Sequence, residues 1–180
     1  MSDFKVTLSG GLSVGSSAEI SFPYTPTVSF GNTSSYSDYD LVHTNYSINA
    51  FSNSRPNNIS IAAPFYNQTI DEAQQTSKII LYLRTNMKMS FGTANGTGAP
   101  PPVLKLNAYG NNLRDVPVVI ISFDTSFSPE PDYVSDGNGS YLPTDMTINI
   151  GLLPQYSATI QSNFDLNTFA SGDGYKQGFI

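Results

Sequence analysis

The chain has 180 residues, of which 39% are hydrophobic, so its length and composition fit one domain with a sizeable core. Only 12% of the residues are charged, against about 25% in an average soluble protein, and the net charge is −6 with eight Lys and Arg. With so few cations and a negative net charge, we expect no nucleic-acid-binding surface. The absence of cysteine excludes disulfides, thiolate nucleophiles and zinc–thiolate sites.

The N-terminal segment, the apolar stretches and the surface composition bear on the location of the protein in the cell. Met1 to Lys5 lacks the basic and apolar regions of a signal peptide, and no apolar stretch reaches the length of a membrane span. We therefore expect a protein that is made in the cytoplasm and is not bound to membranes. A surface rich in Asn, Ser, Thr, Gly and Pro suits either a protein whose surface is largely covered by partners or a secreted β protein with a polar, uncharged surface.

The first part of the chain, residues 1–41, predicts an arm or a set of short strands that becomes ordered on assembly. Apolar and polar residues alternate over Phe4–Leu8, Ile20–Phe22 and Val28–Phe30, which is typical of strands. Tyr36–Asp40 is polar and predicts a loop.

A β domain is expected over residues 42–170. Alternation runs from Val42 to Ala50 and again from Ile59 to Phe65, and the turn-forming run Asn53–Asn58 lies between them. This pattern predicts two strands joined as a hairpin with one face buried.

One convincing helix is predicted at about 70–88. Thr69 and Glu72 have the spacing of a capping box, which satisfies two backbone N–H groups at a helix start. Apolar and small residues recur at helical spacing, with Ile79 and Leu81 widening their face: Ala73, Thr76, Ile80, Leu83 and Met87.

The second half returns to strands, separated by a loop at Pro129–Pro143 and followed by a flexible tail at 171–180. The predicted strands are Leu104–Ala108, Val116–Phe127, Met146–Leu152 and a last one around Ala158–Phe164. Strands, one helix and then strands predict a mainly β fold, a β-sandwich or barrel with one packed helix.

Few residues suggest chemistry. His43 is the only histidine and is expected on the polar side of a strand, and no nucleophile motif accompanies it. Glu130, Asp132 and Asp136 could serve glycoside hydrolysis or bind calcium, but their spacing fits neither well, and tryptophan is absent. We expect no catalytic residue, no cofactor and no metal, and therefore not an enzyme.

A series of segments in the same order resembles a known family, the baseplate tail-tube initiator proteins of contractile-tailed (T4-like) bacteriophages. The resemblance covers roughly Val42 to Ile180. It lies in His43–Asn45, Asn49–Pro56, Ile59–Ile61, Gln68–Thr69, Leu83–Thr85, Met87–Met89, Phe91–Gly92, Gly98–Leu104, Asn107–Gly110, Val116–Val119, Asp132–Val134, Leu142–Ile148, Leu152–Ser157, Phe164, Phe169–Gly172 and Gly178–Ile180.

The resemblance implies a structural virion protein with a tail-tube type of β fold. Six copies would form a ring that joins the baseplate hub to the tail tube, and DNA would pass through its lumen without specific binding. The implied partners are the hub protein, the tail-tube protein or a second tube initiator, and the tape-measure protein as a further candidate. No catalytic residue is implied.

Contacts between neighbouring subunits are expected in the predicted hairpin and in the loop Gly92–Pro102, with Tyr46, Phe51, Arg55 and Pro101 as the candidate residues. Three alternatives remain open from the sequence. The chain could be the repeating tail-tube subunit, a carbohydrate-binding β-sandwich, or a glycan hydrolase that uses Glu130 and Asp132.

Overall fold

The computed structural model describes residues 5–15, 17–92, 98–127, 129 and 132–180. Phe4, Glu130 and part of the predicted contact loop Gly92–Pro102 lie outside the described residues.

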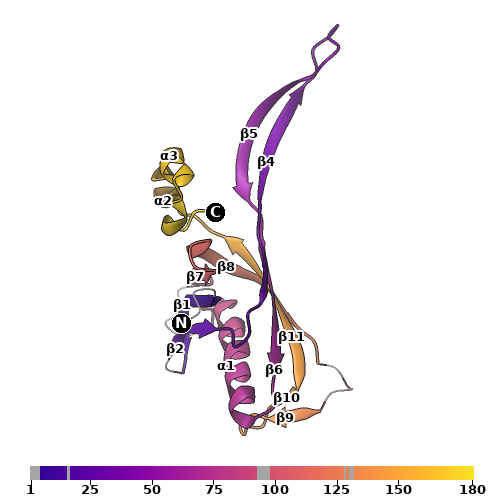
Figure 1. The fold of residues 1–180 in the computed structure, drawn as a ribbon, viewed down its shortest axis with the longest axis vertical. Coiled ribbons are helices and arrows are strands. Elements are labelled where there is room, and N and C mark those ends of the chain that lie inside the picture. The colour runs from indigo at the N-terminus through magenta and orange to yellow at the C-terminus, as the bar shows by residue number, and fades with distance from the viewer. Residues whose placement is uncertain (1–4, 16, 93–97, 128, 130–131) are drawn as a thin grey trace.

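The body of the fold is built on one antiparallel sheet of seven strands, in the order β2-β1-β7-β8-β11-β6-β3 (Figure 1). Its strands are β1 (Thr7–Val14), β2 (Ser17–Ser21), β3 (Thr27–Ser29), β6 (Ile59–Tyr66), β7 (Leu104–Ala108), β8 (Leu113–Thr125) and β11 (Asp145–Pro154). The predicted mainly β fold is thus confirmed. Among the described strands, β2 and β3 form the two edges and do not pair with each other, so a single open sheet stands where a sandwich or barrel was expected.

One face of this sheet carries the core. Along β6 and β11 every second side chain is buried, as the alternation predicted, while the residues between them are exposed or half-buried. The predicted central strand is confirmed as β8, which lies in the middle of the sheet. The short strands expected before residue 41 are present as β1 to β3 and belong to the same sheet.

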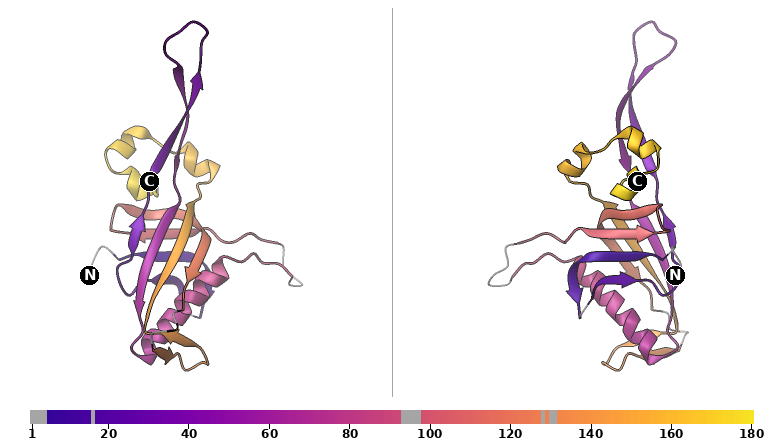
Figure 2. Two further views of the ribbon diagram at one scale, coloured as in Figure 1. Left: turned by 90° about the vertical axis from the view of Figure 1, so that its right-hand side faces the viewer. Right: turned by 60° about the vertical axis from the view of Figure 1, so that its left-hand side comes forward.

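The helix α1 (Ile70–Asn86) covers the buried face of the sheet (Figures 1 and 2). Its capping box is confirmed: the Thr69 hydroxyl accepts the N–H of Glu72, and the Glu72 carboxylate accepts the N–H of Thr69. Those backbone N–H bonds lower the pKa of Glu72. The predicted face is buried except for Met87, which is half-buried, and Leu81, which points outward because Tyr82 and Leu83 fill the core side of that turn.

The end of α1 is joined to a bulge in β1. Gly10 and Gly11 have φ of 89° and 74°, and the pairing of β1 with β2 shifts between Ser9 and Val14. In the gap, Asn86 Oδ1 accepts the N–H of Leu12 at 2.7 Å, and Asn86 Nδ2 donates to the Leu12 carbonyl at 3.2 Å. The side chain of Asn86 therefore takes the place of a strand partner.

A second sheet of two strands, β4 (Asn32–Tyr39) and β5 (Ile48–Pro56), projects from the body (Figure 1, top). Two predictions were wrong here. Tyr36–Asp40 is mostly strand and not loop. The turn lies between β4 and β5 and not at Asn53–Asn58, so Val42 and His43 lie in the turn, before β5 begins.

The reason is that the chain runs on from β5 into β6 without reversing. The pair β3–β6 continues into the pair β4–β5, and the Asn57 N–H donates to the Gly31 carbonyl at 2.8 Å where the two pairs meet. At this junction β3 continues into β4, and β5 continues into β6, so neither strand reverses direction there. The turn-forming residues at Asn57 and Asn58 therefore mark a junction and not a reversal.

A further small hairpin, β9 (Tyr133–Ser135) and β10 (Tyr141–Pro143), occupies part of the predicted loop and lies near the start of α1 (Figure 1, bottom). Its strands have only three residues each, so the sequence shows no clear alternation of apolar and polar residues among the prolines and glycines of that segment.

The last strand predicted around Ala158–Phe164 was wrong. The chain instead forms α2 (Ala158–Ser162) and α3 (Leu166–Ala170). Ser157 accepts the N–H of Ile160, and Asp165 accepts the N–H of Thr168, so each short helix begins at a capping side chain.

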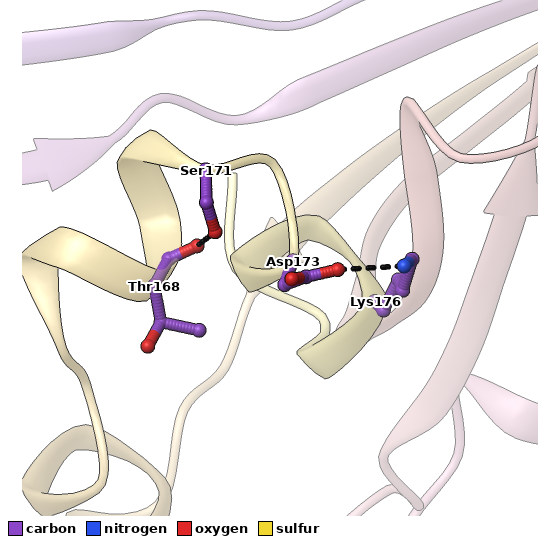
Figure 3. Close-up of polar contacts among 4 residues, drawn as sticks. All are labelled: Thr168, Ser171, Asp173 and Lys176. Carbon is purple, nitrogen blue, oxygen red and sulfur yellow. Dashed lines mark hydrogen bonds and ion pairs between the residues drawn. The ribbon is translucent and has the colours of Figure 1, made fainter.

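The final residues, 171–180, contain the 3-10 helix η1 (Gly174–Gln177). Figure 3 shows its local contacts: the Ser171 hydroxyl donates to the Thr168 carbonyl, and Lys176 Nζ lies 2.6 Å from the Asp173 carboxylate. This contact with Lys176 lowers the pKa of Asp173. Ile180 packs against the core. The flexibility expected of this tail, and the ordering of residues 1–41 on assembly, stay predictions.

Candidate assembly surface

The projecting hairpin β4–β5 is exposed along almost its whole length. Of its strand residues only Ala50 and Pro56 are half-buried. Tyr36 pairs with Phe51, and Tyr39 pairs with Ile48. These two pairs lie three positions apart, so they are on opposite faces of the hairpin. Apolar side chains are therefore presented on both faces, and the described part of the chain covers neither.

Three of the four candidate contact residues lie on this hairpin. Tyr46 is 86% exposed in the turn at its tip, and Phe51 is 59% exposed in β5. Arg55 is exposed near the base, opposite Thr33. The structure therefore brings these residues onto one element, although on a different hairpin from the one predicted.

Pro101 lies elsewhere, half-buried in the segment that connects α1 to β7. Residues 88–92 and 98–103 of this connection leave the body sideways as a second projection (Figure 2). The Ser90 N–H donates to the Ala99 carbonyl at 3.1 Å and holds its two arms together. Its described part exposes Met89, Phe91 and Val103.

A hollow of about 410 Å³ lies between α1 and the hairpin β9–β10. Leu81 and Tyr141 line it and are 52% and 65% exposed, and Lys78 and Arg84 add two cations. Among the described residues the ion pairs are Lys105–Asp115 and Lys176–Asp173, so these two cations have no carboxylate partner there.

The walls of this hollow are held rigidly. The Ser77 hydroxyl donates to Asp136 Oδ2 at 3.1 Å, and Gln74 Nε2 donates to the Asp136 carbonyl at 3.1 Å. The Asp136 carboxylate also accepts the N–H groups of Asn138 and Ser140, and these bonds lower its pKa. Asp136 is thus a buried structural anion.

A buried polar network fixes the start of α1 beside β10. Asn67 Nδ2 donates to the Pro143 carbonyl at 2.8 Å, and the Thr76 hydroxyl donates to Asn67 Oδ1 at 2.7 Å. Both side chains are buried, so breaking either bond would leave a polar atom without a partner. The hollow is consequently a preformed feature of the fold.

The face of the main sheet opposite α1 bears mostly uncharged side chains, and Lys105 of β7, which also lies on it, is 3.8 Å from Asp115. No described helix or strand crosses it (Figure 1). A shallow depression of about 240 Å³ on this face is lined mainly by Thr27, Ser29, Ser60, Ala62, Ser122, Asn149 and Gly151. Asp124 on β8 is the nearest exposed acid along that strand, two residues beyond Ser122.

The candidates for catalysis are not brought together. His43 is exposed in the hairpin turn with φ of 65°, Asp132 is exposed, and Asp136 is buried against α1. Among the described residues, no group of three or more His, Asp or Glu side chains could hold a metal ion.

The sequence did not predict the hollow beside α1, because the apolar face of the helix dominates the periodicity of this segment. A second series at three- and four-residue spacing was available: Gln74, Ser77, Leu81, Arg84 and Lys88. Its one large apolar member, Leu81, also fits beside the apolar face, so the spacing alone predicts that it is buried in the core.

No described helix is long and apolar enough to cross a membrane. No family model and no curated protein matches this chain. Among solved structures, it is similar to a chain from the tail of an empty GTA particle with C6 symmetry. The sequence identity is 12% and the TM-score is 0.35, over 86% of this chain and 96% of that one.

Proposed function

We propose that this chain is a structural subunit of a phage tail that works by self-assembly and is not an enzyme. The observation that carries the proposal is the hairpin β4–β5, which exposes apolar side chains on both faces. An isolated two-stranded hairpin is marginally stable in water, and exposed apolar patches mark interaction sites. A partner that covers both faces would explain why the hairpin exists.

In its specific form, the proposal is a baseplate tail-tube initiator. Six copies form a ring between the baseplate hub and the tail tube, and the two open edges of the main sheet, β2 and β3, are available for pairing between subunits. The order of the segments from Val42 to Ile180, which resembles the initiator family, supports this form.

The face opposite α1 would line the lumen. The depression on this face is lined by uncharged side chains, Lys105 on the same face is paired with Asp115, and the chain as a whole is acidic. DNA would therefore pass along this face without adhering.

The repeating tail-tube subunit is the second candidate, and the projection of the hairpin along the long axis of the molecule favours it (Figure 1). Electron microscopy of the purified chain, with and without tail-tube protein, separates the two. An initiator forms single rings that seed tubes of the added protein, and a tube subunit forms long polymers alone. A stable monomer that binds glycans would overturn both and favour the carbohydrate-binding alternative.

A further inference from the structure

The hollow beside α1 and the tip of the projecting hairpin have complementary chemistry. The hollow offers Lys78 and Arg84 around the apolar side chains of Leu81 and Tyr141. The carboxylate in its lining, that of Asp136, already accepts hydrogen bonds from within the fold. Between residues 36 and 50, the tip carries two carboxylates, Asp38 and Asp40, and its only basic side chain is that of His43.

The tip also supplies apolar side chains to fill the hollow. Tyr39, Leu41, Val42 and Tyr46 are all more than half exposed and surround the two carboxylates. Burial of such side chains is the main favourable term in association, and the flanking ion pairs fix which surfaces meet.

The two surfaces lie at opposite ends of the long axis of the molecule (Figure 1). The hairpin projects at one end, and the hollow between α1 and β9–β10 lies towards the other end. A single copy therefore cannot bring its own tip into its own hollow, whereas two copies arranged head to tail can.

We infer that the hollow beside α1 binds the β4–β5 tip of a second copy of this chain. Lys78 and Arg84 would receive Asp38 and Asp40, and Leu81 and Tyr141 would pack against the apolar side chains of the tip. Such a contact joins two different surfaces, so it continues from copy to copy until rotation closes it into a ring or it propagates as a stack. The inference rests on the proposed function in that both require self-assembly, and it adds the surfaces that meet.

A cross-linking experiment tests the contact directly, because the natural chain has no cysteine. Leu41→Cys in one preparation is mixed with Leu81→Cys in another under mild oxidation. A disulfide forms only when the two Cα atoms come within about 7 Å. The expected result is a disulfide between the two variants. The matched control replaces Leu81→Cys with Arg114→Cys, an exposed position near the start of β8 that does not line the hollow, and is expected to give little product.

A charge exchange tests specificity. Asp38→Lys with Asp40→Lys, and separately Lys78→Glu with Arg84→Glu, should each weaken self-association about tenfold or more. The chain carrying all four changes should recover most of the loss. All four side chains are exposed, so the thermal unfolding midpoint should remain that of the natural chain.

The outcomes distinguish this inference from the proposed function. If the natural chain assembles but the four-fold variant does not recover, or if Arg114→Cys cross-links as well as Leu81→Cys, the inference is overturned and the proposed function stands. If the natural chain shows no self-association at any concentration, both are overturned. Loss of tube seeding with unchanged self-association by the Lys78→Glu, Arg84→Glu variant would assign the hollow to another protein and also overturn the inference.

Discussion

Tyr36 and Phe51 face each other across the projecting hairpin, edge to face, with ring centroids 5.6 Å apart. An aromatic pair of this geometry contributes about 0.5–1.5 kcal/mol. Here both rings remain more than half exposed, so most of the apolar area that they could bury is still available to a partner.

Phe51→Ala should therefore separate assembly from folding. Because Phe51 lies outside the core, the free energy of unfolding should change by about 1 kcal/mol or less. If the ring is buried by a neighbouring subunit, association should weaken by about 2 kcal/mol, or roughly thirtyfold. Sedimentation velocity measures the second effect and urea unfolding the first. Ser34→Ala on the same hairpin is the matched control, and equal effects of the two changes on association would contradict the prediction.

Asn86→Ala should destabilise the fold. It removes both bonds to Leu12 at a fully buried position and leaves the backbone N–H and carbonyl of Leu12 without that partner. The expected loss is about 1–3 kcal/mol, measured by urea unfolding. Asn86→Asp keeps the oxygen that accepts the Leu12 N–H but loses the Nδ2 donor to the Leu12 carbonyl, so it should also lower the free energy of unfolding. Thr85→Ala, one residue away and half-buried, should cost clearly less.

Two glycines with similar backbone angles should respond differently to alanine. A Cβ at Gly11 would lie within van der Waals overlap of Asn86 Oδ1 and Leu104, whereas a Cβ at Gly15 would meet no atom within 4 Å. Gly15→Ala should cost about 1–2 kcal/mol from its positive φ alone. Gly11→Ala should lower the free energy of unfolding by more than Gly15→Ala does, as measured by thermal unfolding. An equal loss of stability for both variants would contradict the packing described around Asn86.

Stability should fall at alkaline pH through Tyr82. Burial raises the pKa of its hydroxyl from 10.0 to about 12, and the hydroxyl donates to the Gly10 carbonyl at 2.6 Å. Because the folded pKa lies above the unfolded one, the protonated form stabilises the fold fully below pH 10, and this contribution is lost as the pH rises through about 12. Tyr82→Phe should cost about 1 kcal/mol at neutral pH.

The difference between the natural chain and Tyr82→Phe should shrink between pH 10 and pH 12. Burial also raises the pKa of Tyr156 to about 12, so the variant keeps part of the alkaline decline. Chemical unfolding at each pH measures the difference, and a constant difference would contradict the role of the Tyr82 proton.

Asp136 should contribute stability with the opposite dependence on pH. The N–H groups of Asn138 and Ser140 and the Ser77 hydroxyl hold its pKa below the ordinary value of 3.8. The carboxylate therefore stabilises the fold above that value, and its contribution is lost as the pH falls through the lowered pKa. Asp136→Asn should lower the unfolding temperature at pH 7, and the difference should narrow as the medium is acidified. Asp132→Asn, whose side chain is exposed, is the control.

Elements with one buried face were predictable from the sequence. Alternation indicated β6 and β11, and the capping box at Thr69 and Glu72 fixed the start of α1. In each case the pattern exists because burial on one side selects apolar residues at a fixed period.

The elements that carry the candidate site lack that selection. Tyr36 and Tyr39 in β4 lie on opposite faces and both are exposed, so no alternation marks the strand. Leu81 is apolar and sits at helical spacing, yet it lies on the outer face of α1. An apolar side chain that packs against another molecule need not recur at the spacing of a buried helix or strand face. Its position therefore cannot be predicted from the periodicity of one sequence.

Electron microscopy of the natural chain beside a Tyr36→Ser, Phe51→Ser variant tests most directly whether this is a structural subunit that assembles through its hairpin. Both side chains lie outside the core, so the variant should fold as the natural chain does. The account predicts closed rings or stacks of rings from the natural chain and dispersed single molecules from the variant. Dispersed single molecules from both, or identical rings from both, would contradict it.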